Sequence, residues 1–290
     1  MSSIRFVTQL YRSVAMVSWS EMQQIKEIAN SRNLLWNLTL RELRSKYRRS
    51  VLGWSWSLLN PLAQMAIYTF VFGLLFGAKA PTGDPSGVTT YGLYLLTGII
   101  PWGFFALICG VGLQSILSNT NLVRKVAFAR ESLVLSQVLF CCVQFSIEMS
   151  LVCLVLLIAG SAVLPWLPVT VLLMVLMACF AGGIALILSV SAVFFRDLPY
   201  LWTIINQLWF FATPVIYDPK IIDGKVPDVL QSILHWNPTA VFIRSFRATT
   251  YHGTAPEWRD LGALFLSAAI SLVIGFATFN KLKRRLAEEL

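Results

Sequence analysis

Residues that could carry out acid–base or metal chemistry are few and scattered in this sequence. Its two histidines, His235 and His252, have no carboxylates around them at the spacings that metal ligands use. The phosphate-binding pattern G-x-x-x-x-G-K-S/T is also absent. The sequence therefore predicts no catalytic residue, no metal site and no nucleotide-hydrolysing site in this chain.

One acid, Glu148, falls in the middle of a long apolar stretch. An ionisable side chain is energetically unfavourable inside a bilayer, so it is a candidate functional residue by default. The alternative is a hydrogen bond or ion pair inside a helix bundle. A proton relay usually needs a chain of such groups, and no second acid accompanies Glu148, which favours the alternative.

The composition indicates what must position these residues. The chain is 57% hydrophobic and 13% charged, with a mean hydropathy of +0.69, which leaves too little polar surface to cover a soluble globule. About 20 helical residues span a bilayer core, and six apolar runs reach or approach that length. These runs, the predicted transmembrane helices, are 56–77, 91–117, 133–159, 167–195, 200–217 and 261–280. The fifth is the shortest, and Pro214 predicts a kink in it.

The distribution of Lys and Arg predicts the orientation. Most of these residues precede the first run, follow the second and fourth runs, or follow the last. Cytoplasmic segments carry such an excess, so both termini are predicted to be cytoplasmic. The net charge of +9 is then a signal for orientation and lipid headgroups. No separable basic face indicates nucleic-acid binding.

The flanking segments predict short amphipathic helices. Residues 1–54 form a cytoplasmic segment in which 20–37 has the spacing of an interface helix. The pattern Thr39-Leu40-Arg41-Glu42 has the form of a capping box that would start a second helix. Residues 55–290 then form one all-α transmembrane domain. Its outer loop, 218–260, predicts two re-entrant helices at 227–236 and 238–252, the second capped by Asn237 and ended by Gly253.

The string from Trp36 to Leu62 is the strongest local signature, and other motifs follow it in order. The matching residues are Arg41-Glu42-Leu43-Arg44, Tyr47-Arg48, Ser50, Leu52-Gly53, Trp56, Asn60-Pro61, Phe195-Arg196-Asp197-Leu198, Ala212-Thr213-Pro214-Val215-Ile216-Tyr217 and Asn237-Pro238. This pattern resembles the permease subunits of ATP-binding-cassette exporters for polysaccharides. That family moves lipid-linked O antigens, capsules, teichoic acids or galactan.

The resemblance implies a bacterial cytoplasmic-membrane protein in which two copies of the permease enclose a channel. Two separate ATPase subunits would bind ATP and Mg²⁺ and drive a polyprenyl-pyrophosphate-linked glycan outward. A permease for drugs or lipids shares this architecture and remains an alternative. A membrane glycosyltransferase or acyltransferase would need clustered acids or histidines at one membrane face, and a structural scaffold is a further alternative.

The resemblance also suggests roles for three groups of residues. Candidates for coupling to the ATPase are Glu21, Trp36, Arg124, Lys125, Phe128 and Arg130. Candidates for the carrier pyrophosphate are Arg44, Arg48 and Arg49, because guanidinium groups bind phosphate through several planar donors. Aromatic rings could line a glycan channel, and the candidates are Tyr68, Phe72, Phe76, Phe104, Phe105, Trp209 and Phe210. The competing interpretations are headgroup anchoring for the charged residues and packing for the aromatic ones.

Overall fold

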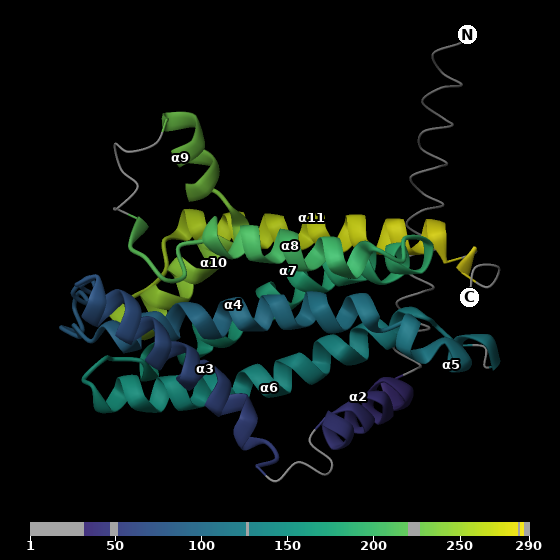
Figure 1. The fold of residues 1–290 in the computed structure, drawn as a ribbon, viewed down its shortest axis with the longest axis horizontal. Coiled ribbons are helices and arrows are strands. Elements are labelled where there is room, and N and C mark those ends of the chain that lie inside the picture. The colour runs from purple at the N-terminus through teal and green to yellow at the C-terminus, as the bar shows by residue number, and fades with distance from the viewer. Residues whose placement is uncertain (1–31, 47–51, 126–127, 220–226, 284, 287–290) are drawn as a thin grey trace.

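The computed structural model describes residues 32–46, 52–125, 128–219, 227–283 and 285–286. Within these ranges the regular secondary structure is entirely helical (Figure 1), as predicted. Three of the predicted site residues, Glu21, Arg48 and Arg49, lie outside the described residues.

Five described helices are long and apolar enough to cross a membrane. They are α3 (Ser55–Tyr68) with its π-helical continuation η1 (Thr69–Leu75), α4 (Tyr91–Gln114), α6 (Glu131–Ile158), α7 (Leu167–Phe194), which the short helix η3 (Leu164–Trp166) precedes, and α11 (Trp258–Leu282). They correspond to five of the six predicted spans, with ends that differ by a few residues. The prediction of an all-α, multi-pass membrane protein is therefore confirmed.

The predicted fifth span, 200–217, is only partly helical. Helix α8 (Leu198–Phe211) has 14 residues, about 21 Å at 1.5 Å per residue, and the chain then turns. Pro214 cannot donate a backbone hydrogen bond, and its carbonyl and that of Val215 accept hydrogen bonds from the buried side chain of Arg247. The six-span count is therefore not confirmed, because α8 is shorter than the helices long enough to cross a membrane. Arg247 binds the turn that follows it.

The predicted capping box is wrong. Helix α2 (Arg32–Lys46) runs without a break through Thr39, which is buried against α6. The Thr39 hydroxyl donates to the carbonyl of Leu35 at 2.8 Å, one turn back in the same helix. Glu42 pairs with its neighbour Arg41 and does not cap the helix. Packing on α6 extends α2 past the point where the local pattern would start a new helix.

The centre of the bundle is built on close approaches between α4, α7 and α11 (Figure 1). Gly183 of α7 and Gly275 of α11 face each other so closely that a Cβ on either would overlap the other helix's backbone. Small residues let two membrane helices approach in this way, and Ser271 adds a hydrogen bond to the carbonyl of Phe180 at 2.7 Å. Gly112 of α4 meets Ala185 of α7 similarly.

The connecting segments contain the remaining short helices. They are η2 (Leu117–Asn119) and α5 (Thr120–Lys125) between α4 and α6, and α9 (Asp228–His235), α10 (Pro238–Arg247) and η5 (Ala248–His252) between α8 and α11. Asn237 caps α10 by accepting from the Thr239 amide, and Gly253 ends η5 with a left-handed φ of 74°, both as predicted. Re-entry of these helices into the membrane stays a prediction.

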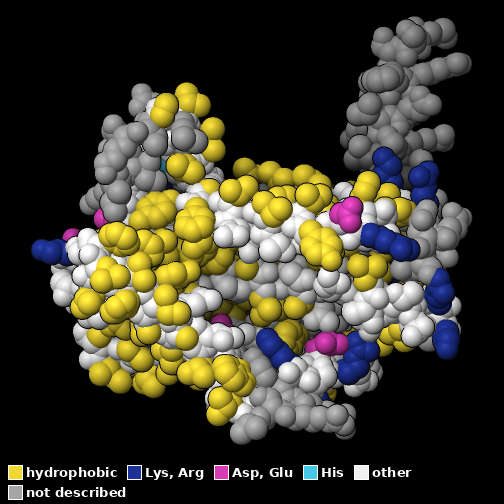
Figure 2. Space-filling model, in the orientation of Figure 1, with side chains coloured by type: hydrophobic (Ala, Val, Ile, Leu, Met, Phe, Trp, Pro, Cys, Tyr) yellow, Lys and Arg dark blue, Asp and Glu magenta, His cyan; other side chains and the backbone are white. Residues whose placement is uncertain are grey.

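The surface shows a division of charge along the bundle. In Figure 2 most visible Lys and Arg side chains gather at the end that carries α5, while apolar side chains are densest toward the opposite end. This is the distribution on which the predicted orientation depends.

Candidate functional site

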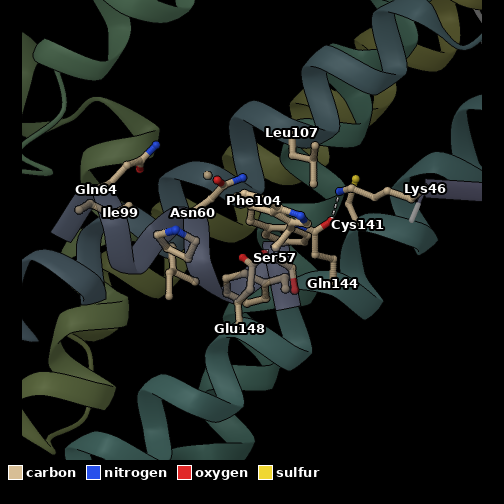
Figure 3. A pocket seen from close by; sticks show the side chains of 15 residues that line it. Lys46, Ser57, Asn60, Gln64, Ile99, Phe104, Leu107, Cys141, Gln144 and Glu148 are labelled. Atoms are coloured by element: carbon tan, nitrogen blue, oxygen red, sulfur yellow. Dashed lines mark hydrogen bonds between the residues drawn. The ribbon is translucent and has the colours of Figure 1, made fainter. Parts of the chain in front are cut away.

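A cavity of about 570 Å³ lies among α2, α3, α4 and α6 (Figure 3). Its α3 wall carries three polar side chains, Ser57, Asn60 and Gln64, spaced so that they share one helix face. Its α6 wall carries Gln144 and Glu148, one helical turn apart. Polar side chains in membrane helices face protein or a water-filled cavity, so this stripe gives a half-open cavity on the side of the bundle a polar strip among apolar walls, and this cavity is called the polar chamber below.

A hydrogen-bonded chain joins the interface helix to this chamber. The Lys46 ammonium, at the end of α2, donates to Oε1 of Gln144, and Nε2 of Gln144 donates to Oε1 of Glu148 at 2.7 Å. Lys46 also lies 4.9 Å from the centre of the Phe140 ring. Burial lowers the pKa of Lys46, and the nearby carboxyl group of Glu148 opposes part of that shift. Glu148 thus has a hydrogen-bond partner inside the bundle.

The aromatic candidates on α4 lie in the bundle interior. Phe105 is fully buried, and its ring packs 5.0 Å from that of Trp209. Phe104 stacks on Phe145 with ring centres 4.3 Å apart and contributes to the cavity wall. In this arrangement Phe105 packs the core, and Phe104 is almost fully buried although it lines the cavity.

The aromatic candidates on α3 and η1 form a ladder. Tyr68 and Phe72 have ring centres 6.1 Å apart, and Phe72 and Phe76 are 6.0 Å apart. Phe76 is 74% exposed. These three rings continue the same i, i+4 row as Asn60 and Gln64, so the polar cavity and the aromatic ladder lie along one side of α3.

The two aromatic candidates on α8 connect that helix to its neighbours. Trp209 donates from Nε1 to Oδ1 of Asn237 at 3.0 Å, which links α8 to the cap of α10. The Phe210 ring lies 5.5 Å from that of Trp102 on α4. Both rings are half-buried, while the opposite face of α8 is exposed.

The charged candidates lie near one end of the bundle but do not form one site. Arg44 is exposed and borders a hollow on α2 that does not include Lys46. Arg124 and Lys125 are exposed on α5. Arg130 donates to the carbonyl of Lys283 at 2.7 Å, so it fastens the start of α6 to the end of α11.

The two remaining coupling candidates differ in exposure. Trp36, on α2, is 58% exposed. Phe128 is half-buried and packs against the core. Only Trp36 of these two therefore offers a large surface to a partner.

Two candidate residues, Lys46 and Arg247, could not be predicted from the sequence. Lys46 is one of many basic residues before the first span, and nothing in the local sequence indicates its partner Gln144, which lies 98 positions away. Arg247 is buried, with its guanidinium 3.8 Å from the centre of the Tyr94 ring. Arg247 follows Arg244 by three residues, so the sequence places both on one face of α10 and gave no signal that Arg247 is buried.

The bundle, its apolar exterior and its polar chamber define a multi-pass helical membrane protein. The ABC-2 type transporter family matches residues 33–251, and the chain belongs to this family. Its family is therefore one of transporters, as the sequence pattern indicated.

Similar proteins extend over nearly the whole chain. The chain is 31% identical to the O-antigen export system permease protein RfbA of Klebsiella pneumoniae, covering 88% of this chain and 94% of that protein. It is 30% identical to RfbA of Myxococcus xanthus, covering 91% and 96%. The polysialic acid transport protein KpsM of Escherichia coli is 23% identical, covering 84% and 91%.

Proposed function

We propose that this chain is the transmembrane subunit of an exporter that moves a lipid-linked polysaccharide across a bacterial cytoplasmic membrane. Two copies would enclose the channel, and two separate ATPase subunits would bind ATP and Mg²⁺ on the cytoplasmic side. The observation that carries the proposal is the 30–31% identity to O-antigen export permeases over almost the full length of both proteins.

The surfaces of α3 and α8 support a second copy as the partner. None of the apolar part of α3 that would span the membrane is buried within one chain, although that helix carries the stripe Asn60 and Gln64. Helix α8 has no buried residue and exposes Ile204 and Leu208. An unburied helix with polar residues is poorly suited to lipid, so another protein surface is the better environment.

The basic end of the bundle supports the placement of the ATPases. Arg124 and Lys125 project from α5 in a connection too short to be a domain. The exposed ring of Trp36 on α2 offers a second contact beside it. With this end in the cytoplasm, both groups would face the ATPase subunits. The carrier pyrophosphate would then meet Arg44 and the neighbouring basic residues before it reaches the membrane.

The test is co-expression with the ATPase encoded beside this chain, purification through a tag on the permease, and assay of ATP hydrolysis in lipid. Addition of the cell's lipid-linked glycan should raise the hydrolysis rate. A drug-like or phospholipid substrate that raises it while the glycan does not would overturn the proposal in favour of the alternative exporters.

Two sets of variants test the two interfaces separately. The double variant Arg124→Glu, Lys125→Glu should lose the ATPase during purification, because it reverses the charge of α5, and unchanged co-purification would exclude that contact. Cysteines placed at Ile204 or Leu208 should cross-link two copies if α8 lies at the dimer interface. Val175→Cys, on the exposed face of α7, is the matched control that should not cross-link.

A further inference from the structure

The chamber bordered by Lys46, Gln144 and Glu148 has a chemistry that an aromatic channel alone does not explain. It combines a cation, three side-chain amides (two on α3 and one on α6), a carboxylate and a hydroxyl with the exposed indole of Trp56. Its volume of about 570 Å³ is within the range of small-ligand sites.

The arrangement of these groups is directional. Figure 3 shows Lys46 and Gln144 toward one end of the cavity and Gln64 toward the other. Gln64 lies nine residues after Ser55, the first residue of α3, which is about 14 Å along the helix axis. From Gln64 the same helix row continues into the rings of Tyr68 and Phe72. The cavity is therefore charged at one end and leads to the aromatic ladder at the other.

Each part of the cavity matches a different part of an amphiphilic ligand. An ammonium group binds phosphate as a point charge. Sugar hydroxyls both donate and accept hydrogen bonds, as the side-chain amides of Asn60 and Gln64 do. A phospholipid headgroup held near Lys46 would supply the phosphate, but it would leave the amides and Glu148 farther along the cavity unused.

We propose that this cavity binds the junction between phosphate and first sugar of the lipid-linked glycan, with the phosphate at Lys46 and the sugar between Asn60, Gln64 and Glu148. The inference rests on the proposed function and adds a binding site within each copy of the chain. The sugar would then lie at the start of the aromatic row on α3, from which the glycan passes outward.

Two glycines of α4 provide a matched test. A Cβ at Gly103, which lines the cavity, would meet no atom within 4 Å, and the same is true at Gly110, which does not line it. Gly103→Trp should fill the cavity without disturbing the helix. Gly110→Trp places the same side chain on the same helix outside the cavity.

The assay measures binding to the complex with its ATPase in lipid nanodiscs. The probes are the cell's lipid-linked glycan, polyprenyl pyrophosphate without sugar, and phosphatidylglycerol. We expect the wild-type complex to bind the glycan about tenfold or more tightly than the sugar-free carrier. Gly103→Trp and Gln64→Leu should abolish this difference in affinity, and Gly110→Trp should preserve it. Lys46→Met should weaken both pyrophosphate probes, and Lys46→Arg should restore them. Ser150→Leu, an exposed polar-to-apolar change on α6, should have no effect.

The outcomes separate this site from the exporter function. If Gly103→Trp binds the glycan as the wild type does while the glycan still stimulates ATP hydrolysis, the exporter stands and the cavity site is wrong. Displacement of the glycan by phosphatidylglycerol at equal concentration would make the cavity a phospholipid site. Failure of the glycan to bind or stimulate the wild-type complex would overturn both proposals.

Discussion

Helices α7 and α3 are both long and apolar, but the bundle treats them differently. Of the membrane-spanning part of α7, 61% is buried within the chain, whereas none of that of α3 is. Helix α7 packs through glycine and alanine against α4 and α11, while α3 exposes polar and aromatic side chains. The comparison separates a rigid scaffold from a surface available to a partner or a substrate. The span of α7 is also the more apolar of the two, with a mean hydropathy of 2.8 against 1.5 for that of α3. Hydropathy does not by itself say which span packs in the bundle, because lipid and protein interiors are similarly apolar.

The largest expected effect comes from breaking the scaffold. Gly183→Ala places a methyl group against the backbone of Ser271, where no flexible side chain can move away. We expect a loss of about 3 kcal/mol or more of stability, seen as a lower apparent melting temperature in detergent. Gly262→Ala, on an exposed part of α11, is the control and should be neutral or slightly stabilising. Equal melting temperatures for the two variants would contradict the tight α7–α11 contact.

The next effect concerns the buried cation that holds the turn after α8. Arg247→Met leaves the carbonyls of Pro214 and Val215 without the donors now at 2.7 and 2.6 Å. A loss of about 2–3 kcal/mol is expected, again measured as thermal stability. Arg247→Lys should recover only part of it, because an ammonium lacks the planar fork. Full recovery by Lys would show that charge alone matters there.

For the exposed aromatic ladder we expect a substitution to change export without changing stability. Phe76→Ala removes a ring that is 74% exposed, so stability should change by less than about 0.5 kcal/mol. Glycan export should nevertheless fall by about threefold to tenfold if the ring contacts the moving chain. Export assayed in cells beside the melting temperature separates the two effects. Unchanged export by the variant would show that Phe76 does not contact the glycan.

The smallest effect is expected at the surface of α2. Glu42→Gln breaks an ion pair with Arg41, which also donates to Asn119 at 2.9 Å. Exposed pairs contribute about 0–1 kcal/mol, so the melting temperature should change little. A large loss would mean that this contact between α2 and η2 belongs to the scaffold and not to the adaptable surface.

Much of the fold could be predicted from local sequence because membrane spans are set by run length. The ends of five helices, the Asn237 cap and the left-handed Gly253 depend on neighbours within a few residues. Less of the candidate site could be predicted from the sequence. Glu148 stood out as an acid in an apolar run, but its partner chain through Gln144 to Lys46 joins two helices that are far apart in sequence.

The sequence by itself determined that this protein crosses a membrane through helices, where the five long apolar helices lie, and which family it belongs to, because apolar run length and short motifs are local properties. Only the tertiary structure decided that α2 continues through Thr39, that Arg247 binds the turn after α8, and that Lys46 borders a polar cavity. The physical reason is shared: burial on α6, the reach of Arg247 and the hydrogen bond to Gln144 all come from residues distant in sequence, and they override or complete what the local pattern favours.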